Sequence, residues 1–332
     1  MKMTAVQTSV RILSSVIYVI VASLITIVLS KWMNSDETTA STFAQTVKGL
    51  VSHPTGISLQ DVGGHSSIKD ELRASVLLPM QRPGIFYGGP RAIRPPRGIL
   101  LHGPPGTGKT MLARAIACES GVPLITLHSA ALESKWWGES PKLLQAVFHE
   151  ARTTYAPCII FFDEIDGLGR TRNEQDQSCV YSFKCELLRN MDSIDDSAVV
   201  VIACTNSVTS IDPALKRRFQ RVLRVGKPSA EERRDVLKVI TRDENDTVLC
   251  SNVAERTHDY TGADMSSLYE EASSIRMRTT HIPWNRIRSG NDLVRRIGPL
   301  TLEHWEQAAI NAGKPLSTPQ AELATKPQQD HG

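Results

Sequence analysis

A glycine-rich stretch that follows a short apolar run has the spacing of a phosphate-binding loop. It reads GPPGTGKT over residues 103–110, which matches the P-loop pattern G-x-x-x-x-G-K-T. Glycines let such a loop turn its N–H groups inward, and the helix that follows adds its positive N-terminal end. In this pattern the lysine reaches the β- and γ-phosphates and the threonine hydroxyl ligates Mg²⁺. The residues expected to bind nucleotide phosphate here are Gly103, Pro104, Pro105, Gly106, Thr107, Gly108, Lys109, Thr110 and Met111.

A pair of acidic residues ends another apolar run. Asp163 and Glu164 directly follow residues 158–162. A carboxylate is a hard oxygen ligand for Mg²⁺ and also an acceptor that can orient a water molecule. An Asp-Glu pair alone is often a solvated strand end, but behind a buried strand and after a P-loop it predicts catalysis. We expect Asp163 to hold Mg²⁺ together with Thr110, and Glu164 to polarise the water that attacks ATP.

Further polar residues follow the next predicted strand and the short predicted helix after it. Asn206 follows the run 198–204, so strand pairing would bring its amide beside Glu164 and the γ-phosphate. Arg217 and Arg218 follow a short predicted helix. By residue type alone, these two arginines form either a solvated basic face or arginine fingers that reach the nucleotide of a neighbouring subunit.

Two adjacent tryptophans, Trp136 and Trp137, precede Gly138 in a predicted loop. Neighbouring residues in a loop do not both bury easily in one core. One reading places one tryptophan in the core and the other in an interface. The alternative is that both are exposed and grip an apolar partner of variable sequence.

The fold class expected from these runs is α/β. Continuous apolar strands that alternate with helical patterns predict a doubly wound parallel sheet of about five strands, covered on both faces and binding ligands at the carboxyl ends of the strands. The predicted strands are 98–102, 123–128, 158–162, 198–204 and 221–225. The predicted helices are 66–77, which would end near Pro79, followed by 109–119, 140–153, 178–191 and 212–218. The Pro- and Gly-rich stretch 83–97 is expected to be a loop.

The pattern becomes purely helical after Pro228. Ser229 and Glu232 have the spacing of a capping box. A second helix is expected to start near Gly262, and a last helix is expected to carry Trp305. These patterns divide the folded part into a large α/β ATPase subdomain at 57–228, a small helical lid at 229–312 and a disordered tail at 313–332.

The N-terminal region contains an uncharged apolar stretch at residues 12–29, between an N-terminal flank (1–11) and a polar linker (30–56). Eighteen helical residues span roughly 27 Å, about one hydrocarbon core. A cleaved signal peptide would have a shorter apolar region and an A-x-A site, which is absent after the stretch. We expect one transmembrane helix. The flanking charges do not orient it, but an ATPase must face a compartment that holds ATP, so we expect the ATPase to face the cytosol.

Composition narrows the functional classes. The net charge of +3 is too small to imply a nucleic-acid partner. The cysteines form no C-x-x-C pair, which favours reduced thiols in a cytosol-like compartment. A zinc protease attached to the ATPase would need an H-E-x-x-H motif, and the sequence has none.

The motifs GPPGTGKT, FFDEID, ACTN and DPALKRRF together resemble the AAA ATPase family over about residues 57–312. The resemblance implies a homo-hexamer with ATP sites between subunits. It implies that Arg217 and Arg218 act in trans as arginine fingers and that Asn206 is sensor 1. It also implies that the adenine is surrounded by Asp61, Val62, Gly63, Gly262 and Ala263.

A narrower resemblance rests on ISLQDVGG, a single ATPase module, KWWGES and one N-terminal span. This combination is similar to the Msp/ATAD-type extractases of the mitochondrial outer membrane and peroxisomes, which remove mislocalised tail-anchored proteins. In that group a tyrosine usually stands where this chain has Trp137. The resemblance implies that Trp136, Trp137 and Gly138 form a pore loop that contacts the client. The endoplasmic reticulum is a further candidate location.

Of two other functions, the first is kept as the alternative and the second is disfavoured. A severing or disassembly ATPase of the katanin and spastin group shares the same module. A non-hydrolysing scaffold would not need the intact set of Lys109, Asp163, Glu164 and Asn206.

Overall fold

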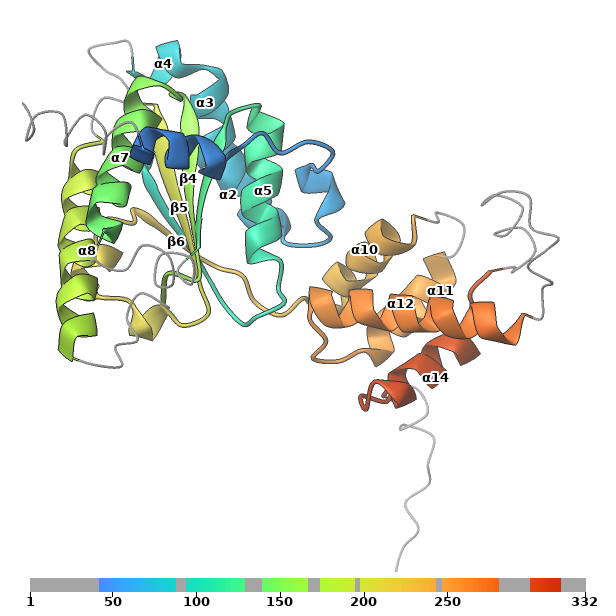
Figure 1. Ribbon diagram of the computed structural model, residues 1–332. Helices are drawn as coiled ribbons and strands as arrows, with labels where there is room; N and C mark the ends of the chain where they lie inside the picture. Colours follow the sequence, from blue (N-terminus) through green and yellow to red (C-terminus); the bar gives the residue numbers. More distant parts are fainter. Residues whose placement is uncertain are drawn as a thin grey trace, which may run out of the picture.

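The computed structural model describes residues 42–87, 94–128, 139–166, 174–194, 198–242, 247–280 and 299–317. These residues form a large unit around a central sheet and a smaller helical unit beside it (Figure 1). The predicted membrane span at 12–29 lies outside the described residues. Within the described ranges, no helix combines the length and the apolar character that a bilayer crossing requires.

The sheet has six strands in the order β1-β3-β4-β5-β2-β6. β2 to β6 pair in parallel, and β1 pairs antiparallel with β3 at one edge. The strands are β1 (Val51–Ser52), β2 (Gly98–His102), β3 (Leu124–His128), β4 (Cys158–Asp163), β5 (Val199–Thr205) and β6 (Arg221–Arg224). The predicted parallel sheet is confirmed, and β1 is an addition that the sequence did not predict.

Successive side chains along each inner strand point to opposite faces of the sheet, and both faces are buried. On β4, Ile160 and Phe162 belong to one core cluster, whereas Ile159 and Phe161 belong to the other. This alternation explains why the inner strands are apolar at nearly every position before their carboxyl ends. The helices and helical turns of the large unit are residues 42–50, η1 (Leu59–Asp61), α2 (Ser66–Leu72), η2 (Arg73–Leu77), α3 (Leu78–Gln81), α4 (Pro83–Tyr87), α5 (Lys109–Ser120), α7 (Ser140–Thr153), α8 (Glu174–Asp192), η4 (Val208–Ser210) and α9 (Pro213–Lys216).

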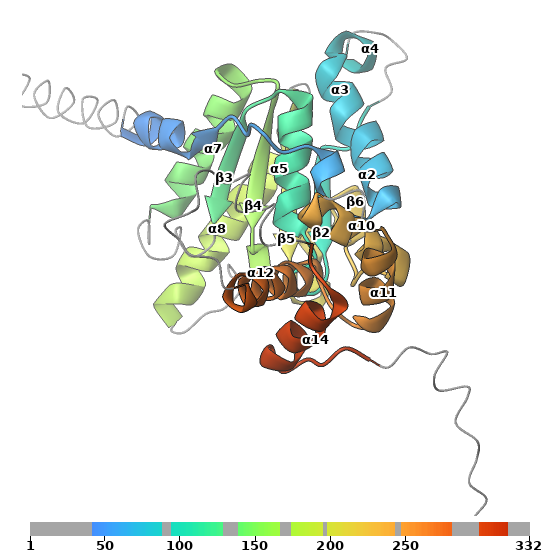
Figure 2. The ribbon, with the colours of Figure 1, turned by 90° about the vertical axis from the view of Figure 1, so that its right-hand side faces the viewer.

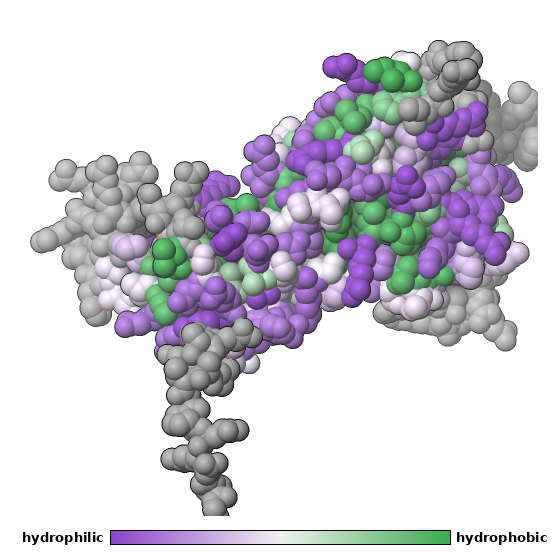
Figure 3. Space-filling model, turned by 180° about the vertical axis from the view of Figure 1, so that it is seen from behind, coloured by the Kyte–Doolittle hydropathy of each residue, from purple (hydrophilic) through white to green (hydrophobic). Residues whose placement is uncertain are grey.

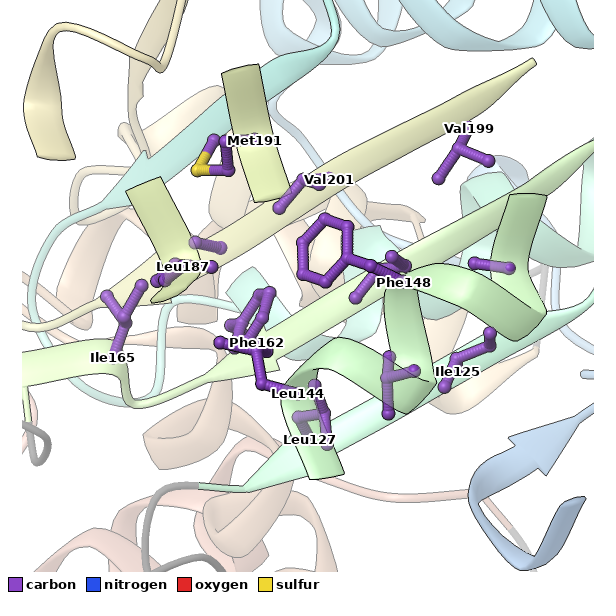
Figure 4. Packing of buried hydrophobic residues seen from close by; sticks show 14 of the residues in the cluster. Ile125, Leu127, Leu144, Phe148, Phe162, Ile165, Leu187, Met191, Val199 and Val201 are labelled. Atoms are coloured by element: carbon purple, nitrogen blue, oxygen red, sulfur yellow. The ribbon is translucent and has the colours of Figure 1, made fainter. Parts of the chain in front are cut away.

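The two clusters divide these helices between the two faces. One face is covered by α7 and α8, where Phe148 lies beside Phe162 and Val201 (Figure 4). The opposite face is covered by α2 and α5, whose buried residues include Leu72 and Leu112. The sheet is thereby held rigidly between two helical layers, and the loops at its carboxyl edge are free to bind a ligand.

Residues 42–52 belong to the large unit, although the sequence placed them in a linker. The helix at 42–50 buries Phe43 and Val47 in the same cluster as α7 and α8. Val51 then pairs with Ile125 at the edge of the sheet. The linker prediction was therefore wrong for this segment, because two apolar residues one helical turn apart are enough to dock a mainly polar helix.

We expect Phe43→Ala to lower the free energy of unfolding by about 3 kcal/mol, because it removes a buried aromatic ring from the core. Phe43 is 6% exposed. Urea unfolding of the full chain measures this change. Gln45→Ala is the matched control, since Gln45 is exposed on the same helix. Equal effects of the two substitutions would mean that the helix is not packed on the core.

The helix predicted at 66–77 continues past its expected end near Pro79. A π-helical turn over Arg73–Leu77 joins α2 to α3 without a break, and Pro79 follows this turn within α3. The predicted loop at 83–97 likewise begins with a short helix, α4, which starts at a proline. Neither proline ended its segment: Pro79 follows a π-helical turn, and Pro83 is the first residue of α4, where its missing N–H costs little.

The α3–α4 corner exposes apolar side chains. Leu78 is 50% exposed and Ile85 is 63% exposed. In Figure 3, hydrophobic atoms gather at this end of the large unit, beside a mostly hydrophilic surface.

The small unit contains α10 (Ala230–Thr241), α11 (Thr247–Arg256), α12 (Gly262–Thr279) and α14 (Leu302–Asn311) (Figure 2). The predicted capping box of Ser229 and Glu232 is present at the start of α10. Trp305 is 1% exposed and lies at the centre of the core of this unit. α11 is an additional helix that the sequence did not predict.

The first residues of the predicted disordered tail are also packed. Lys314 forms an ion pair with Asp264 at 2.8 Å, and its carbonyl accepts a hydrogen bond from the Tyr260 hydroxyl. The Ser317 N–H donates to the Arg256 carbonyl at 2.9 Å. The tail prediction was therefore wrong for 313–317, which lie against the helical unit, and the residues beyond 317 lie outside the described ranges.

Candidate nucleotide site

The predicted phosphate loop connects β2 to α5 at the carboxyl edge of the sheet. Gly106 and Gly108 have φ values of +75° and +93°, which L side chains rarely adopt. A Cβ on Gly106 would also lie 2.9 Å from Thr261 Oγ1. Glycine is therefore required here both by the backbone conformation and by the close approach of the helical unit.

Lys109 extends from the first turn of α5 into this loop. Its side chain is buried, and Nζ donates to the carbonyls of Gly103 and Pro104 at 2.8 Å each and to Asn206 Oδ1 at 2.9 Å. Burial lowers the pKa of the Lys109 ammonium, while nearby acidic groups, including Asp163, oppose this shift. The lysine ammonium thus places a positive charge beside the phosphate loop, where hydrogen bonds hold it, one of them to Asn206.

Thr110 and Asp163 face each other beside the lysine. The Thr110 hydroxyl lies 3.3 Å and 3.2 Å from the two carboxylate oxygens of Asp163. Asp163 is the last residue of β4, in register with His128 at the end of β3. The two hard oxygen groups that were predicted to hold Mg²⁺ are therefore adjacent, as a divalent-ion site requires.

Glu164 adopts a left-handed conformation directly after β4, with φ of 53°. This conformation is costly for a residue other than glycine and is typically retained at functional positions. Its side chain is exposed, and it forms no hydrogen bond with other described residues. The carboxylate is therefore free to bind a water molecule at the edge where Lys109 and Asn206 also lie.

Asp166 was not predicted from the sequence, but it holds the end of β5 in place. Its Oδ1 accepts hydrogen bonds from Thr205 Oγ1 at 2.9 Å and from the Asn206 N–H at 3.3 Å. These bonds fix the backbone that presents the Asn206 amide to Lys109. The sequence signal that could have identified Asp166 is its position as the last residue of the motif FFDEID.

A cavity of about 490 Å³ lies between the phosphate loop and the helical unit. This volume lies within the range of ligand pockets. The lining includes every predicted adenine contact, namely Asp61, Val62, Gly63, Gly262 and Ala263, and the apolar side chains Val236, Val239 and Ile240. Of the predicted phosphate-loop residues, Gly103 and Pro104 lie outside the lining, and their carbonyls accept hydrogen bonds from Lys109.

The helical unit contacts the phosphate loop directly. The Ala263 N–H donates to the Gly106 carbonyl at 3.0 Å. On the other side, a Cβ on Gly63 would lie 2.3 Å from the Cα of Val236 in α10. The cavity walls therefore come from both units. An apolar slot, a glycine-rich cradle, a buried lysine and a Thr–Asp pair fit the base, phosphates and metal ion of Mg²⁺-ATP.

Arg217 and Arg218 lie away from this cavity. Both line a second hollow of about 390 Å³ together with Asp192. Arg218 forms a bidentate pair with Asp192, with Nε–Oδ1 at 3.0 Å and Nη2–Oδ2 at 2.9 Å. Arg217 is exposed, and its side chain forms no hydrogen bond or ion pair with other described residues. The predicted pore loop, Trp136 to Gly138, lies outside the described residues.

Comparison with known proteins identifies this arrangement. The model of the "ATPase family associated with various cellular activities (AAA)" matches residues 99–227. The outer mitochondrial transmembrane helix translocase of Danio rerio is 34% identical over 257 residues, which cover 75% of this chain and 67% of that protein. The chain belongs to the AAA ATPase family. As a member of this family it binds nucleotide and is an ATP hydrolase, and AAA ATPases generally form oligomers.

Two further relatives support this assignment. A katanin p60 ATPase-containing protein of Rattus norvegicus is 38% identical over 242 residues, 70% of this chain and 49% of that protein. A crystal structure of the FIGL-1 AAA domain in complex with ADP matches with a TM-score of 0.66 and 30% identity, covering 86% of this chain and 94% of that one. The AAA chain thus spans about two thirds of the translocase and about half of the katanin protein.

Proposed function

We propose that this AAA ATPase is anchored in a membrane by residues 12–29 and uses ATP hydrolysis to extract membrane helices from the bilayer. The observation that carries the hydrolytic part is the contact of Lys109 Nζ with Asn206 Oδ1 at 2.9 Å, beside the Thr110–Asp163 pair. The similarity to a transmembrane helix translocase supports the client class. The clients we propose are mislocalised tail-anchored proteins.

Each residue at the carboxyl edge of the sheet has a distinct role in the proposed reaction. Lys109 would bind the β- and γ-phosphates, while Thr110 and Asp163 would hold the metal ion. Bound Mg²⁺ would supply charge neutralisation at the phosphates. Glu164 would accept a proton from the attacking water, and Asn206 would orient that water. The groups already lie close together, since Lys109 Nζ contacts Asn206 and Thr110 contacts Asp163. To bind phosphate, the Lys109 ammonium would exchange at least one of its three protein acceptors for a phosphate oxygen.

The site gains its last groups from a neighbouring subunit in the proposed homo-hexamer. Arg217 and Arg218 do not line the nucleotide cavity of their own chain. An exposed guanidinium such as that of Arg217 can reach the γ-phosphate held by the next subunit, where it would stabilise the charge that develops during transfer. Hydrolysis would then depend on contact between subunits.

The extraction step needs a grip that tolerates many sequences. Trp136 and Trp137 of the proposed pore loop would supply it through apolar contact and stacking. A membrane helix has about twenty apolar residues, and each CH₂ group that leaves lipid for water costs about 0.8 kcal/mol. Repeated ATP-driven strokes around a ring are therefore more suitable than a single binding event.

Severing or disassembly of a filament is the second candidate function. The similarity to a katanin protein favours it, because both chains share the ATPase module. The two functions differ in the client, which is a protein filament in one case and a membrane protein in the other.

Trapping of clients distinguishes these functions. A Glu164→Gln variant that binds ATP without hydrolysing it should retain its client during cross-linking in cells. We expect tail-anchored membrane proteins among the cross-linked partners, at the mitochondrial outer membrane, the peroxisome or the endoplasmic reticulum in parallel imaging. Recovery of tubulin without membrane proteins would instead support the severing function. Wild-type protein treated in the same way is the control.

A further inference from the structure

We propose that His65 is a positioning residue that couples the helical unit to the phosphate loop. The inference rests on the proposed nucleotide site, and it assigns to His65 and Glu232 roles in that site that the motifs did not indicate. His65 is 8% exposed, lies between the segment 61–64 and α2, and is itself one of the residues that line the cavity. It contacts both the phosphate loop and α10, although neither is near it in the sequence.

The side chain of His65 reaches the phosphate loop. Its Nε2 lies 3.1 Å from the carbonyl oxygen of Thr107. A carbonyl only accepts, so Nε2 carries the proton and donates. The Thr107 carbonyl and the Gly108 N–H belong to one planar trans peptide unit, in which they point in opposite directions. By fixing the direction of the Thr107 carbonyl, His65 therefore also fixes the opposite direction of the Gly108 N–H. Gly108 lines the cavity.

The backbone of His65 is fixed by the helical unit. Its N–H donates to Glu232 Oε1 at 2.8 Å, and its ring Nδ1 lies 3.9 Å from the same oxygen. The other oxygen of Glu232 accepts from the Ser229 N–H at 2.9 Å in the capping box of α10. One carboxylate thus caps α10 in the helical unit and holds the residue that precedes α2 in the large unit.

The fit around this connection is tight. His65 has φ of 54°, a left-handed conformation that is costly for histidine. A Cβ on Gly64 would lie 2.8 Å from the Cβ of Glu232. Because the backbone cannot relax independently of α10, a movement of the helical unit over the base shifts His65. That shift changes the direction of the Gly108 N–H, which links base binding to phosphate binding.

Affinities for ADP and adenosine test this link in the full chain. His65→Asn removes the reach to Thr107 and retains a residue that tolerates the left-handed backbone. We expect its Kd for ADP to rise about tenfold, the value of one hydrogen bond, with the Kd for adenosine changed less than about twofold. His65→Gln, whose amide N–H can replace Nε2, should recover most of the ADP affinity.

Glu232→Gln tests the connection from the side of the helical unit, because Glu232 does not line the cavity. We expect a selective rise of about threefold in the Kd for ADP. Glu231→Gln is the matched control, since it removes the same charge from the same helical turn at an exposed position. Equal losses for ADP and adenosine in His65→Asn, or none for either, would overturn the proposal. Failure of the wild-type chain to hydrolyse ATP would instead count against the proposed function, because the binding measurements do not depend on turnover.

Discussion

Glu164→Gln is expected to lower the kcat of ATP hydrolysis by about 10²- to 10⁴-fold, the usual contribution of a general base. The substitution preserves the size of the side chain and removes its ability to accept a proton. Because the Glu164 carboxylate is exposed and forms no hydrogen bond with other described residues, the free energy of unfolding should change by less than about 0.5 kcal/mol. Phosphate release measures turnover, and fluorescent nucleotide titration measures binding.

The two measurements together separate catalysis from binding. ATP should bind Glu164→Gln with nearly wild-type affinity, because Lys109 and Thr110 remain in place. Lys109→Ala is the informative comparison, since it removes a buried ammonium with three acceptors and should abolish both binding and turnover. Turnover by Glu164→Gln within about threefold of the wild type would show that another group activates the water.

Arg217→Ala is expected to lower turnover by about 10³-fold or more in the assembled protein, the range measured for arginine fingers. Arg217 is exposed and lies outside the nucleotide cavity of its own chain, so this loss would arise at a subunit interface. Lys216→Ala is the control, because it removes an exposed cation one position earlier. Sedimentation analysis should show that both variants assemble like the wild type.

Mixed assemblies test whether Arg217 acts in trans. A Glu164→Gln subunit retains Arg217, and an Arg217→Ala subunit retains Glu164. In an equal random mixture, about a quarter of the interfaces combine one intact group from each variant, as a head-to-tail ring permits. Turnover should therefore reappear on mixing two inactive proteins. If the mixture is as inactive as its components, the site is completed within one chain or by another residue.

The parts of the site that could be predicted from the sequence are those encoded by neighbouring residues. Lys109 and Thr110 follow glycines whose spacing is typical of a tight phosphate-binding loop, and Asp163 ends a buried strand. Once the strands are parallel, their carboxyl ends must meet, and this brings Asn206 to Lys109. Local pattern and sheet geometry together were sufficient for these positions.

The contacts that were not predicted join residues far apart in the chain. His65 and Glu232 are separated by 167 positions, and although Glu232 belongs to a predicted capping box, no sequence pattern joins it to His65. β1 has only two residues and pairs with β3 because the helix before it docks on the core. A sequence pattern does not encode such contacts, because they depend on how completed elements pack against each other.

The docking of residues 42–52 determines how the ATPase would transmit force to a membrane. Twelve residues lie between the proposed span, which ends at Leu29, and Thr42. At full extension they span about 42 Å, so Thr42, where the docked helix begins, would stay within that distance of the bilayer. The reaction to each pull on a client would pass along this tether to Phe43, Val47 and β1. The tether would therefore transmit mechanical load as well as localise the ATPase to the membrane. Its length would limit the gap between bilayer and ring through which a client enters.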